Sequence, residues 1–383
     1  MLHNTYWLLS ASLIFFYAFF FILYIKNWKS LIYVNKSKNF TPQTLISVLI
    51  PARNEEDYIL NCLQSILKGN YPPHLFEIIV IDDHSEDLTP QYVRDLEHPN
   101  VHLIQLKNYV KLGENQPFKK RAIEAAIGEA KGDLIVTTDA DCIAPKQWLT
   151  LIAAFYETEG KRFIAAPVNF HEEESLFEQF QSLDYIGMMG ITGAGVQGNF
   201  SHICNGANLA YEKKLFYEVG GFKDIDHVAS GDDMLLMQKV ARFYPKSLGF
   251  LKNAEATVLT KAKPTLKDFL SQRMRWASKS SSYTEVFTVF QLVVVFLFCC
   301  NFLFSLVATI FWDVQFIFIF ILQVIIKFLF DYIFLNTMTL FFNRKDLMRI
   351  FLPAQFMHII YIIYVGFSSN FKKKYIWKGR SVK

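Results

Sequence analysis

The chain has 383 residues, of which 52% are hydrophobic and 38 are Phe. This length allows one large domain plus further segments, and the hydrophobic fraction is high enough to indicate membrane segments. The net charge of +4 gives no sign of nucleic-acid binding, and the five cysteines, scattered and without a Cys-x-x-Cys pair, indicate neither a disulfide framework nor a zinc site.

The segment from Trp7 to Ile25 is an uncharged apolar run of the length that crosses a bilayer. We interpret it as a transmembrane helix within residues 1–26. A cleaved signal peptide is the competing interpretation, but no basic residue precedes the run and no small-residue cleavage site follows it. Lys26 and Lys29 follow the run, and the positive-inside tendency then places the linker 27–44 and the residues after it in the cytoplasm.

From about Leu45, short apolar runs alternate with polar, helix-like stretches. This pattern predicts an α/β domain with a mostly parallel sheet, whose ligands bind beyond the carboxyl ends of the strands. The predicted elements are strands at 46–51, 77–81, 101–106 and 134–138 and helices at 57–68, 90–97 and 119–130.

Polar side chains follow three of these strands. Singly, each group is explained as well by a helix cap or a turn as by a binding site. Three such ends meeting at one sheet edge favour a nucleotide pocket, in which one carboxylate accepts hydrogen bonds from a base or ribose. The groups are Arg53, Asn54 and Glu55; Asp82 and Asp83; and Asp139 and Asp141.

Asp139 and Asp141 end the third of these strands. If the backbone stays extended there, its period of two puts both carboxylates on one side, where they can face one hard cation held against a diphosphate. Lys119 and Lys120 open the helix before this strand. They could reach the phosphates, although solvated lysines on a first helical turn are an equally good explanation.

Three further features follow in the chain. Phe163–Pro167 is a strand candidate, and the apolar stripe in His171–Met189 fits either a core helix or a helix close to the membrane. Gly187–Gly198 predicts a flexible loop on the acceptor side. Asp232 and Asp233 open a predicted helix, where carboxylates favour the helix dipole but could also serve as a general base.

The last third of the chain is predicted to be membrane, over 281–370, with spans at 286–311 and 316–341. The third segment, 351–367, is shorter, and an interfacial or re-entrant placement keeps the basic tail 371–383, with Lys372–Lys374, in the cytoplasm. Lys327 and Asp331, four residues apart, either pair structurally or line an acceptor groove.

A series of motifs resembles the membrane-bound family 2 glycosyltransferases, which have the Rossmann-like GT-A fold. In order, they are Pro51-Ala-Arg-Asn-Glu55, Asp82-Asp-His-Ser85, Lys119-Lys-Arg-Ala-Ile123, Asp139-Ala-Asp141, Asn205-Gly-Ala-Asn-Leu-Ala210, Gly220-Gly-Phe222, Gly231-Asp-Asp233 and Gln272-Arg-Met-Arg-Trp276. The last resembles the Gln-x-x-Arg-Trp element of polysaccharide synthases and ceramide-type glucosyltransferases. The resemblance implies a nucleotide-diphosphate sugar donor, a Mg²⁺ or Mn²⁺ ion and inversion at the anomeric carbon.

The resemblance also implies roles for individual residues. Asp233 is expected to be the catalytic base and Asp232 its support, although the family usually has Glu at the position of Asp232. Asp139 and Asp141 are expected to hold the metal. The residues expected to bind the donor are Pro51, Arg53, Glu55, Asp82, Asp83, Lys119, Lys120, Asp139, Gln272, Arg275 and Trp276.

We therefore expect a catalytic GT-A domain over 45–280 that faces the cytoplasm, at a bacterial inner or plasma membrane. The expected activity is hexosyl transfer to a lipid or lipid-linked acceptor. A processive polysaccharide synthase is one alternative, and a membrane scaffold with a degenerate transferase domain is another. A secondary transporter fits less well, because the hydrophobic segments are few and show no repeat.

Overall fold

The structure, a computed structural model, describes residues 2–35, 40–110, 118–228, 230–371, 375–377 and 380–382. Lys36, Lys38, Lys372–Lys374 and Lys378 therefore lie outside the described residues. The chain forms two compact units. We call Met1–Ser30, Glu173–Ser201 and Ala262–Lys373 the helical unit, and Leu31–Glu172, His202–Lys261 and Lys374–Lys383 the sheet unit.

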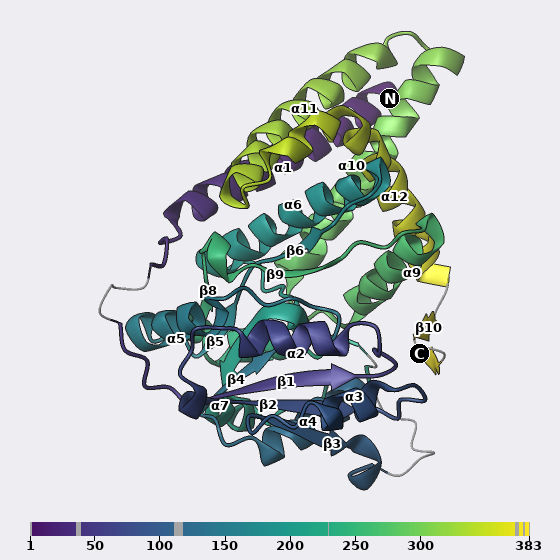
Figure 1. Cartoon of the computed structure of the whole chain (residues 1–383). Coiled ribbons are helices and arrows are strands. Elements are labelled where there is room, and N and C mark those ends of the chain that lie inside the picture. Colours follow the sequence, from purple (N-terminus) through teal and green to yellow (C-terminus); the bar gives the residue numbers. More distant parts are fainter. Residues whose placement is uncertain are drawn as a thin grey trace. The chain divides into compact units, whose positions relative to one another are not determined.

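The sheet unit contains a seven-stranded sheet of order β3-β2-β1-β4-β7-β5-β8 (Figure 1). Its strands are β1 (Ile46–Ala52), β2 (Phe76–Asp82), β3 (Val101–Gln105), β4 (Leu134–Thr137), β5 (Phe163–Ala165), β7 (Leu209–Glu212) and β8 (Leu248–Phe250). Strands β1 to β4 are mutually parallel, whereas β7 runs antiparallel to β4 and β5. This confirms the predicted mostly parallel α/β sheet. Two pairs lie outside it: β6 (Val168–His171) with β9 (Val258–Lys261), and β10 (Tyr375–Trp377) with β11 (Arg380–Val382).

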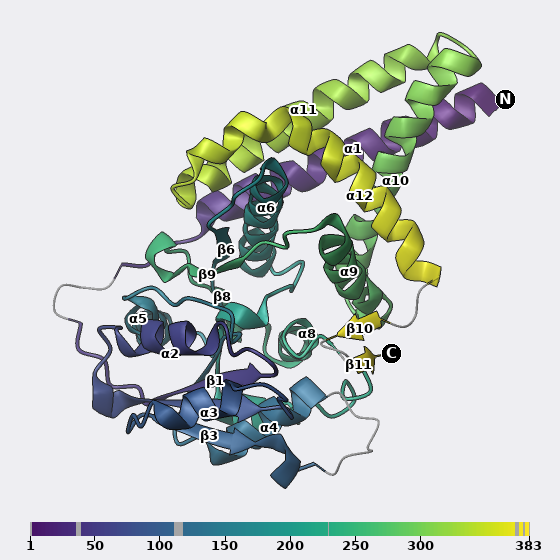
Figure 2. The ribbon, with the colours of Figure 1, turned by 45° about the vertical axis from the view of Figure 1, so that its right-hand side comes forward.

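Helices cover both faces of this sheet. In both views α2 and α5 lie on one face and α4 on the other (Figure 2). Buried Ile59, Cys62, Leu63 and Ile66 form the inner side of α2. The helices of the sheet unit are α2 (Ile59–Leu67), η1 (Pro73–Leu75), α3 (Thr89–Asp95), η2 (Leu106–Asn108), α4 (Phe118–Glu129), α5 (Trp148–Glu159), η3 (Gly206–Asn208), α7 (Lys213–Glu218), α8 (Met234–Phe243), η4 (Pro245–Ser247) and η5 (Ala254–Ala256).

The strand register places the predicted polar groups at one sheet edge. Ala52 is opposite Asp82 across β1 and β2, and Leu49 is opposite Thr137 across β1 and β4. Because β4 ends opposite Leu49, Pro51 lies beyond the β4 pairing and its missing N–H costs no bond to that strand. The three segments that follow β1, β2 and β4 therefore leave the sheet on the same side.

The helical unit contains α1 (Leu2–Ser30), α6 (Leu176–Gly198), α9 (Leu266–Ala277), η6 (Ser278–Ser282), α10 (Val286–Phe311), α11 (Phe316–Phe341), η7 (Lys345–Ile350) and α12 (Phe351–Phe371). Its core contains Cys299, Phe302 and Ile359 from α10 and α12. Among the described residues, four helical segments are long and apolar enough to cross a membrane: Thr5–Ser30, Val286–Phe311, Phe316–Phe341 and Lys345–Ser369. Two of these have the predicted bounds. Residues 351–367 lie within the continuous helix α12. Their interfacial or re-entrant placement stays a prediction.

The predicted loop at Gly187–Gly198 is wrong, because these residues form the second half of α6. Glycine serves there for close packing rather than for flexibility. A Cβ at Gly190 would lie 2.2 Å from the sulfur of Met338 on α11, and one at Gly195 would lie 2.4 Å from the carbonyl oxygen of Ser201. Such distances exclude any side chain, so the glycines allow α6 to pack directly against its neighbours.

Polar side chains pair with one another inside the helical unit. Lys327 Nζ lies 2.6 Å from Asp331 Oδ2, and the Tyr17 hydroxyl donates to the other oxygen of Asp331. Elsewhere Tyr24 donates to Gln291 at 2.8 Å. Lys327 is fully buried. The predicted pairing of Lys327 with Asp331 is therefore present, which satisfies two charges that would be costly in lipid.

The two compact units divide the chain differently from the predicted domain 45–280. The helices α6 and α9 fall inside that range but belong to the helical unit. The physical reason is that the buried faces of α6 and α9 pack against α1, α11 and α12. A linear boundary at residue 280 cannot represent a unit built from three separate stretches.

Candidate active site

Two segments at the sheet edge, 53–56 after β1 and 82–89 after β2, interlock through hydrogen bonds. The guanidinium of Arg53 donates to the carbonyl oxygens of Asp83 at 2.9 Å and His84 at 3.0 Å. The amide of Glu55 donates to the Thr89 hydroxyl at 2.8 Å. Arg53, predicted to bind the donor, is thus buried and holds the second segment in place.

Each segment contains one non-glycine residue in the left-handed backbone conformation. Asn54 and His84 have φ values of 51° and 56°. Asn54 Oδ1 accepts from the Glu86 amide at 2.9 Å, and Asp82 Oδ1 accepts from the Ser85 amide at 3.0 Å. Non-glycine residues in this conformation cost free energy and persist only where surrounding contacts stabilise them, and they cluster at functional sites. Asp82 and Asp83, the predicted base or ribose ligands, are both buried in this arrangement.

Asp139 and Asp141 do not lie on an extended strand. β4 ends at Thr137, and a turn follows in which the Cys142 amide donates to the Asp139 carbonyl at 3.1 Å. The period-two argument for their common orientation is therefore wrong. Burial raises the pKa of the Cys62 and Cys142 thiols, and both carboxylates raise it further. The carboxylates of Asp139 and Asp141 therefore still lie close to the same two thiols.

Lys119 joins the predicted donor and catalytic carboxylates. Its ammonium lies 2.9 Å from Asp139 Oδ1 and 3.5 Å from Asp232 Oδ2. Burial alone would lower the pKa of Lys119, but the carboxylates of Asp139, Asp232 and Asp233 raise it overall. The sheet unit thus brings three of the predicted carboxylates, from two distant parts of the sequence, around the Lys119 ammonium.

Asp233 is held by two backbone amides. Its Oδ2 accepts from the Gly206 amide at 3.0 Å, and its Oδ1 accepts from the Met234 amide at 2.7 Å, as the N-cap of α8. Gly231, two residues earlier, has φ of 80°, a conformation that favours glycine. These two contacts fix the orientation of the Asp233 carboxylate.

Lys120 has a different position from the one predicted. Its side chain is 1% exposed, and its ammonium donates to the carbonyl oxygens of Ile225 and Val228. Asn208, within the Asn205–Ala210 motif, is also buried. Its amide donates to the carbonyl oxygens of Pro167 and Ala256, and its oxygen accepts from Trp148. Both side chains therefore hold backbone in place.

Gln272, Arg275 and Trp276 lie on α9 in the helical unit. Between them, Arg273 is buried and pairs with Asp184 at 2.8 Å. Its guanidinium carbon lies 4.4 Å from the centre of the Trp276 ring. The Tyr361 hydroxyl donates to the other oxygen of Asp184 at 2.8 Å. One face of Trp276 is thus occupied by Arg273, which limits how the ring can meet a sugar.

Asp139 and Asp141 offer hard oxygen ligands of the kind that Mg²⁺ and Mn²⁺ prefer. No group of three or more His, Cys, Asp or Glu side chains suited to a metal ion occurs among the described residues. A metal held by these two carboxylates would take its remaining ligands from phosphate oxygens and water.

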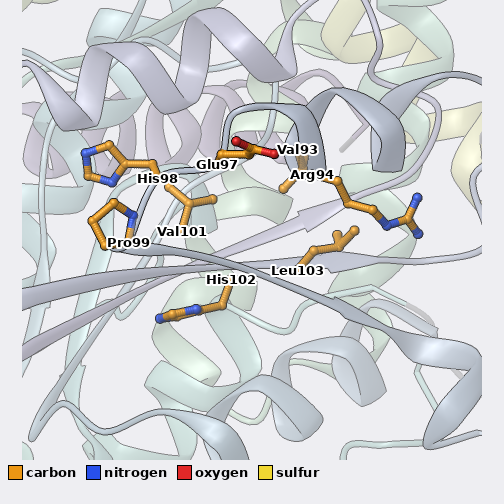
Figure 3. Close-up of a pocket in the computed structure, with 8 residues that line it drawn as sticks. All are labelled: Val93, Arg94, Glu97, His98, Pro99, Val101, His102 and Leu103. Atoms are coloured by element: carbon orange, nitrogen blue, oxygen red, sulfur yellow. The ribbon is translucent and has the colours of Figure 1, made fainter.

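A surface cavity of about 530 Å³ lies elsewhere, between α3 and β3 (Figure 3). Its lining includes Arg94, Glu97, His98 and His102 and none of the predicted site residues. The cavity is therefore separate from the carboxylates around Lys119.

The sequence did not indicate several residues that hold the site together. Gly206 was noted only within a motif, and its amide bond to Asp233 depends on tertiary placement. Asp184 and Arg273 are 89 residues apart. The sequence signal for this pair was Asp184 itself, an acidic residue in an otherwise apolar helix face, because a buried carboxylate requires a partner.

Comparison with known families adds a second line of support. The model described as "Glycosyl transferase family 2" matches residues 47–220. The model described as "Glycosyl transferase family group 2" matches residues 134–366, which is more than half of the chain. The chain belongs to this glycosyltransferase family. The membership covers β4 to α12 and thus includes Asp139, Asp233 and the Gln272–Trp276 segment.

Individual relatives are distant. "Probable glycosyltransferase YdaM" of Bacillus subtilis is 24% identical over 246 residues, 61% of this chain and 54% of that protein. "Undecaprenyl-phosphate 4-deoxy-4-formamido-L-arabinose transferase" of Pseudomonas fluorescens is 27% identical over 146 residues, 37% of this chain and 40% of that protein. The chain spans about half the length, or less, of the curated relatives it matches first.

One solved structure resembles nearly the whole chain. It is "Mannosyltransferase PcManGT from Pyrobaculum calidifontis in complex with GDP-Man and Mn2+", with a TM-score of 0.55 and 16% identity, and the match covers 97% of this chain and 98% of that one. At this identity the likeness shows the fold alone. The glycosyltransferase thus has the predicted GT-A fold.

Proposed function

We propose that this glycosyltransferase moves a hexose from a nucleotide-diphosphate sugar to a lipid or lipid-linked acceptor, with inversion, at the cytoplasmic face of a membrane. The observation that carries the proposal is the gathering of Asp139, Asp232 and Asp233 around the Lys119 ammonium. Asp139, on the donor side, and the Asp232/Asp233 carboxylates thus lie near one cation. This arrangement suits a reaction in which a diphosphate leaves while a hydroxyl loses its proton.

In this mechanism Asp233 accepts the proton of the acceptor hydroxyl. The hydroxyl oxygen forms a bond to the anomeric carbon as the bond from that carbon to the diphosphate breaks, so the configuration inverts. The amides of Gly206 and Met234 hold the Asp233 carboxylate in position throughout. Lys119 places positive charge between the Asp232/Asp233 carboxylates and Asp139 on the donor side, where negative charge develops on the leaving group.

Asp139 and Asp141 would hold the Mg²⁺ or Mn²⁺ ion, which when bound supplies positive charge to the diphosphate. Within the donor site, Asp82 and Asp83 are proposed to accept hydrogen bonds from the nucleoside, with Pro51 and Glu55 beside them. Gln272, Arg275 and Trp276 are proposed to contact the diphosphate and the sugar, and a guanidinium suits phosphate oxygens in a bidentate manner.

Two observations support a lipid acceptor and a cytoplasmic site. The described residues include four helical segments long and apolar enough to cross a membrane, and Lys26 and Lys29 lie at the end of the first. The Pseudomonas relative is named for undecaprenyl phosphate. A membrane-embedded enzyme meets a lipid substrate within the same surface, so we prefer single transfer to a lipid over synthesis of a secreted polymer.

The test begins with the purified full chain in detergent and a thermal-shift panel of UDP-glucose, UDP-N-acetylglucosamine and GDP-mannose, each with Mn²⁺ and with EDTA. We expect one donor to stabilise the protein only with Mn²⁺. That donor, radiolabelled, is then incubated with total membrane lipids. One labelled hexose in the organic phase supports the proposal. Long water-soluble products would instead show a processive synthase, and no binding or transfer would favour a non-catalytic scaffold.

A further inference from the structure

The loop from Gly220 to Val228 joins α7 to the segment that bears Asp232 and Asp233. Two lysines bind its backbone. Lys120 on α4 donates to the carbonyl oxygens of Ile225 and Val228, the latter at 2.7 Å. Lys239 on α8 donates to the carbonyl oxygens of Gly221 at 3.0 Å and Lys223 at 2.7 Å. The backbone on the approach to the catalytic pair is thus fixed by ammonium groups from two helices.

The burial of Lys120 distinguishes it from an ordinary helix-surface lysine. Its side chain is 1% exposed. Removing an ammonium group from water is costly unless hydrogen bonds replace its hydration, and a solvated lysine would support α4 equally well. The bonds to Ile225 and Val228 repay this cost, so they account for a charged residue at a core position.

We propose that Lys120 is a positioning residue for the transfer reaction, which sets Asp232 and Asp233 by holding the loop that precedes them. This inference rests on the proposed function, in which Asp233 is the base. Val228 is only four residues before Asp232, and a chain spans at most about 3.6 Å per residue, so an anchored Val228 restricts where the pair can lie.

The neighbouring residue on α4 reinforces this anchoring. Lys119 contacts Asp232 at 3.5 Å and Asp139 at 2.9 Å. The first turn of α4 therefore touches the catalytic segment twice, through Asp232 itself and through the carbonyls of the loop before it. On the other side, the Gly206 amide holds Asp233. Loss of Lys120 would leave the carboxylate held at Gly206 but loosen the approach to it.

The experiment compares K120M and K120R with the matched control K213M. Lys213 donates to the Ala130 carbonyl at 2.6 Å, a bond of the same kind that lies outside the Gly220–Val228 loop. For each variant, kcat, the KM for the sugar nucleotide chosen from the panel of UDP-glucose, UDP-N-acetylglucosamine and GDP-mannose, and hydrogen exchange of a peptide over 220–233 are measured. D233N and the double variant K120M/D233N complete the set.

We expect K120M to lower kcat about 10- to 100-fold, since displacement of a catalytic group by about 1 Å has effects of this order. KM should change less than about 2-fold, and the 220–233 peptide should exchange faster. K120R should recover at least part of kcat, and K213M should stay within about 3-fold of the parent. The double variant should be no slower than D233N, because both changes act through one group.

Three outcomes would overturn the inference: a kcat of K120M equal to that of K213M, a loss confined to KM, or faster loop exchange with unchanged kcat. If K120M does not fold, the same criteria are applied to K120R, in which increased loop exchange without a lower kcat would overturn it. Failure of the proposed function is recognised separately, because D233N would then retain turnover whatever the Lys120 variants do.

Discussion

The Gly206 amide donates to Oδ2 of Asp233 at 3.0 Å, and this single bond joins the start of η3 to the N-cap of α8. An amide donor orients a carboxylate without neutralising it. The Gly206 amide therefore fixes the position of the Asp233 carboxylate, which its proposed role as general base requires.

Replacing Asp233 with Asn should abolish transfer while leaving donor binding intact. Asn keeps the shape and can still cap α8, but it cannot take up the proton. Loss of a positioned base typically costs about 10²- to 10⁴-fold in rate. The measurement is kcat beside donor affinity by titration calorimetry. The control is D133N, a change at an exposed aspartate just before β4. A D233N enzyme with retained turnover would exclude Asp233 as the base.

Removal of the Lys119 charge should shift the pH dependence of the reaction. Burial lowers the pKa of Lys119 but its carboxylate neighbours raise it overall, so the ammonium stays charged at every working pH. In K119M the carboxylates lose this cation, and their pKa values rise. The acid limb of the kcat/KM profile should therefore move to higher pH. K131M, at an exposed lysine, is the control. An acid limb that does not move in K119M would show that Lys119 has no electrostatic effect on Asp232 and Asp233.

Asp139 and Asp141 should control metal-dependent donor binding. We expect D139N and D141N to lose the stabilisation by Mn²⁺ plus donor that the parent shows, because amides are weaker ligands for a hard dication than carboxylates. D133N, at an exposed aspartate just before the opposite end of β4, serves as the control. Thermal shifts with Mn²⁺ and with EDTA provide the measurement. Equal Mn²⁺ dependence in all three variants would contradict the assignment.

Gly190 should tolerate no side chain. A Cβ there would meet Met338 Sδ at 2.2 Å and Phe334 at 2.8 Å, so G190A should destabilise the helical unit by about 1–3 kcal/mol through overpacking. G128A is the matched control, since a Cβ at Gly128 on α4 meets nothing within 4 Å. It should stabilise by about 0.5–1 kcal/mol through helix propensity. The melting temperature in detergent measures both, and a neutral G190A would show that α6 can move away from α11.

Variants of the Lys327–Asp331 pair can distinguish a structural role of this pair from a role in binding the acceptor. K327M alone leaves Asp331 buried without its cation and should cost about 3–5 kcal/mol. The double variant K327M/D331L, made in a Y17F background so that the Tyr17 hydroxyl does not lose its acceptor, should be close to neutral. Melting temperatures and transfer activity are measured together. A double variant that folds normally but no longer transfers sugar would show that the pair lines the acceptor path instead.

Much of the fold could be predicted, since period and composition determine it locally. The buried strands Ile46–Ala52 and Phe76–Asp82 and the spans Val286–Phe311 and Phe316–Phe341 are continuous apolar runs. The helix at Gly187–Gly198 was missed, because glycine signals a loop unless the packing partner is known. Here the partner is Met338, about 150 residues away in the sequence and invisible to a local pattern.

The candidate site was predicted in part. The motifs identified which carboxylates lie together, and the contacts of Lys119 agree with that grouping. The motifs did not separate Lys119 from Lys120, because consecutive residues of a helix point in different directions and only tertiary packing determines which one is buried. Arg53 was also assigned to the donor, whereas its bonds to Asp83 and His84 require knowledge of the neighbouring segment.

The bond between Tyr17 and Asp331 joins residues 314 positions apart. During synthesis, the first helix therefore leaves the ribosome long before the helix that completes its polar contacts exists. The Tyr17 hydroxyl is therefore without its Asp331 acceptor while the sheet unit is made. A chain stopped before residue 331 would expose an unsatisfied hydroxyl on α1, which is a feature that membrane quality control could recognise.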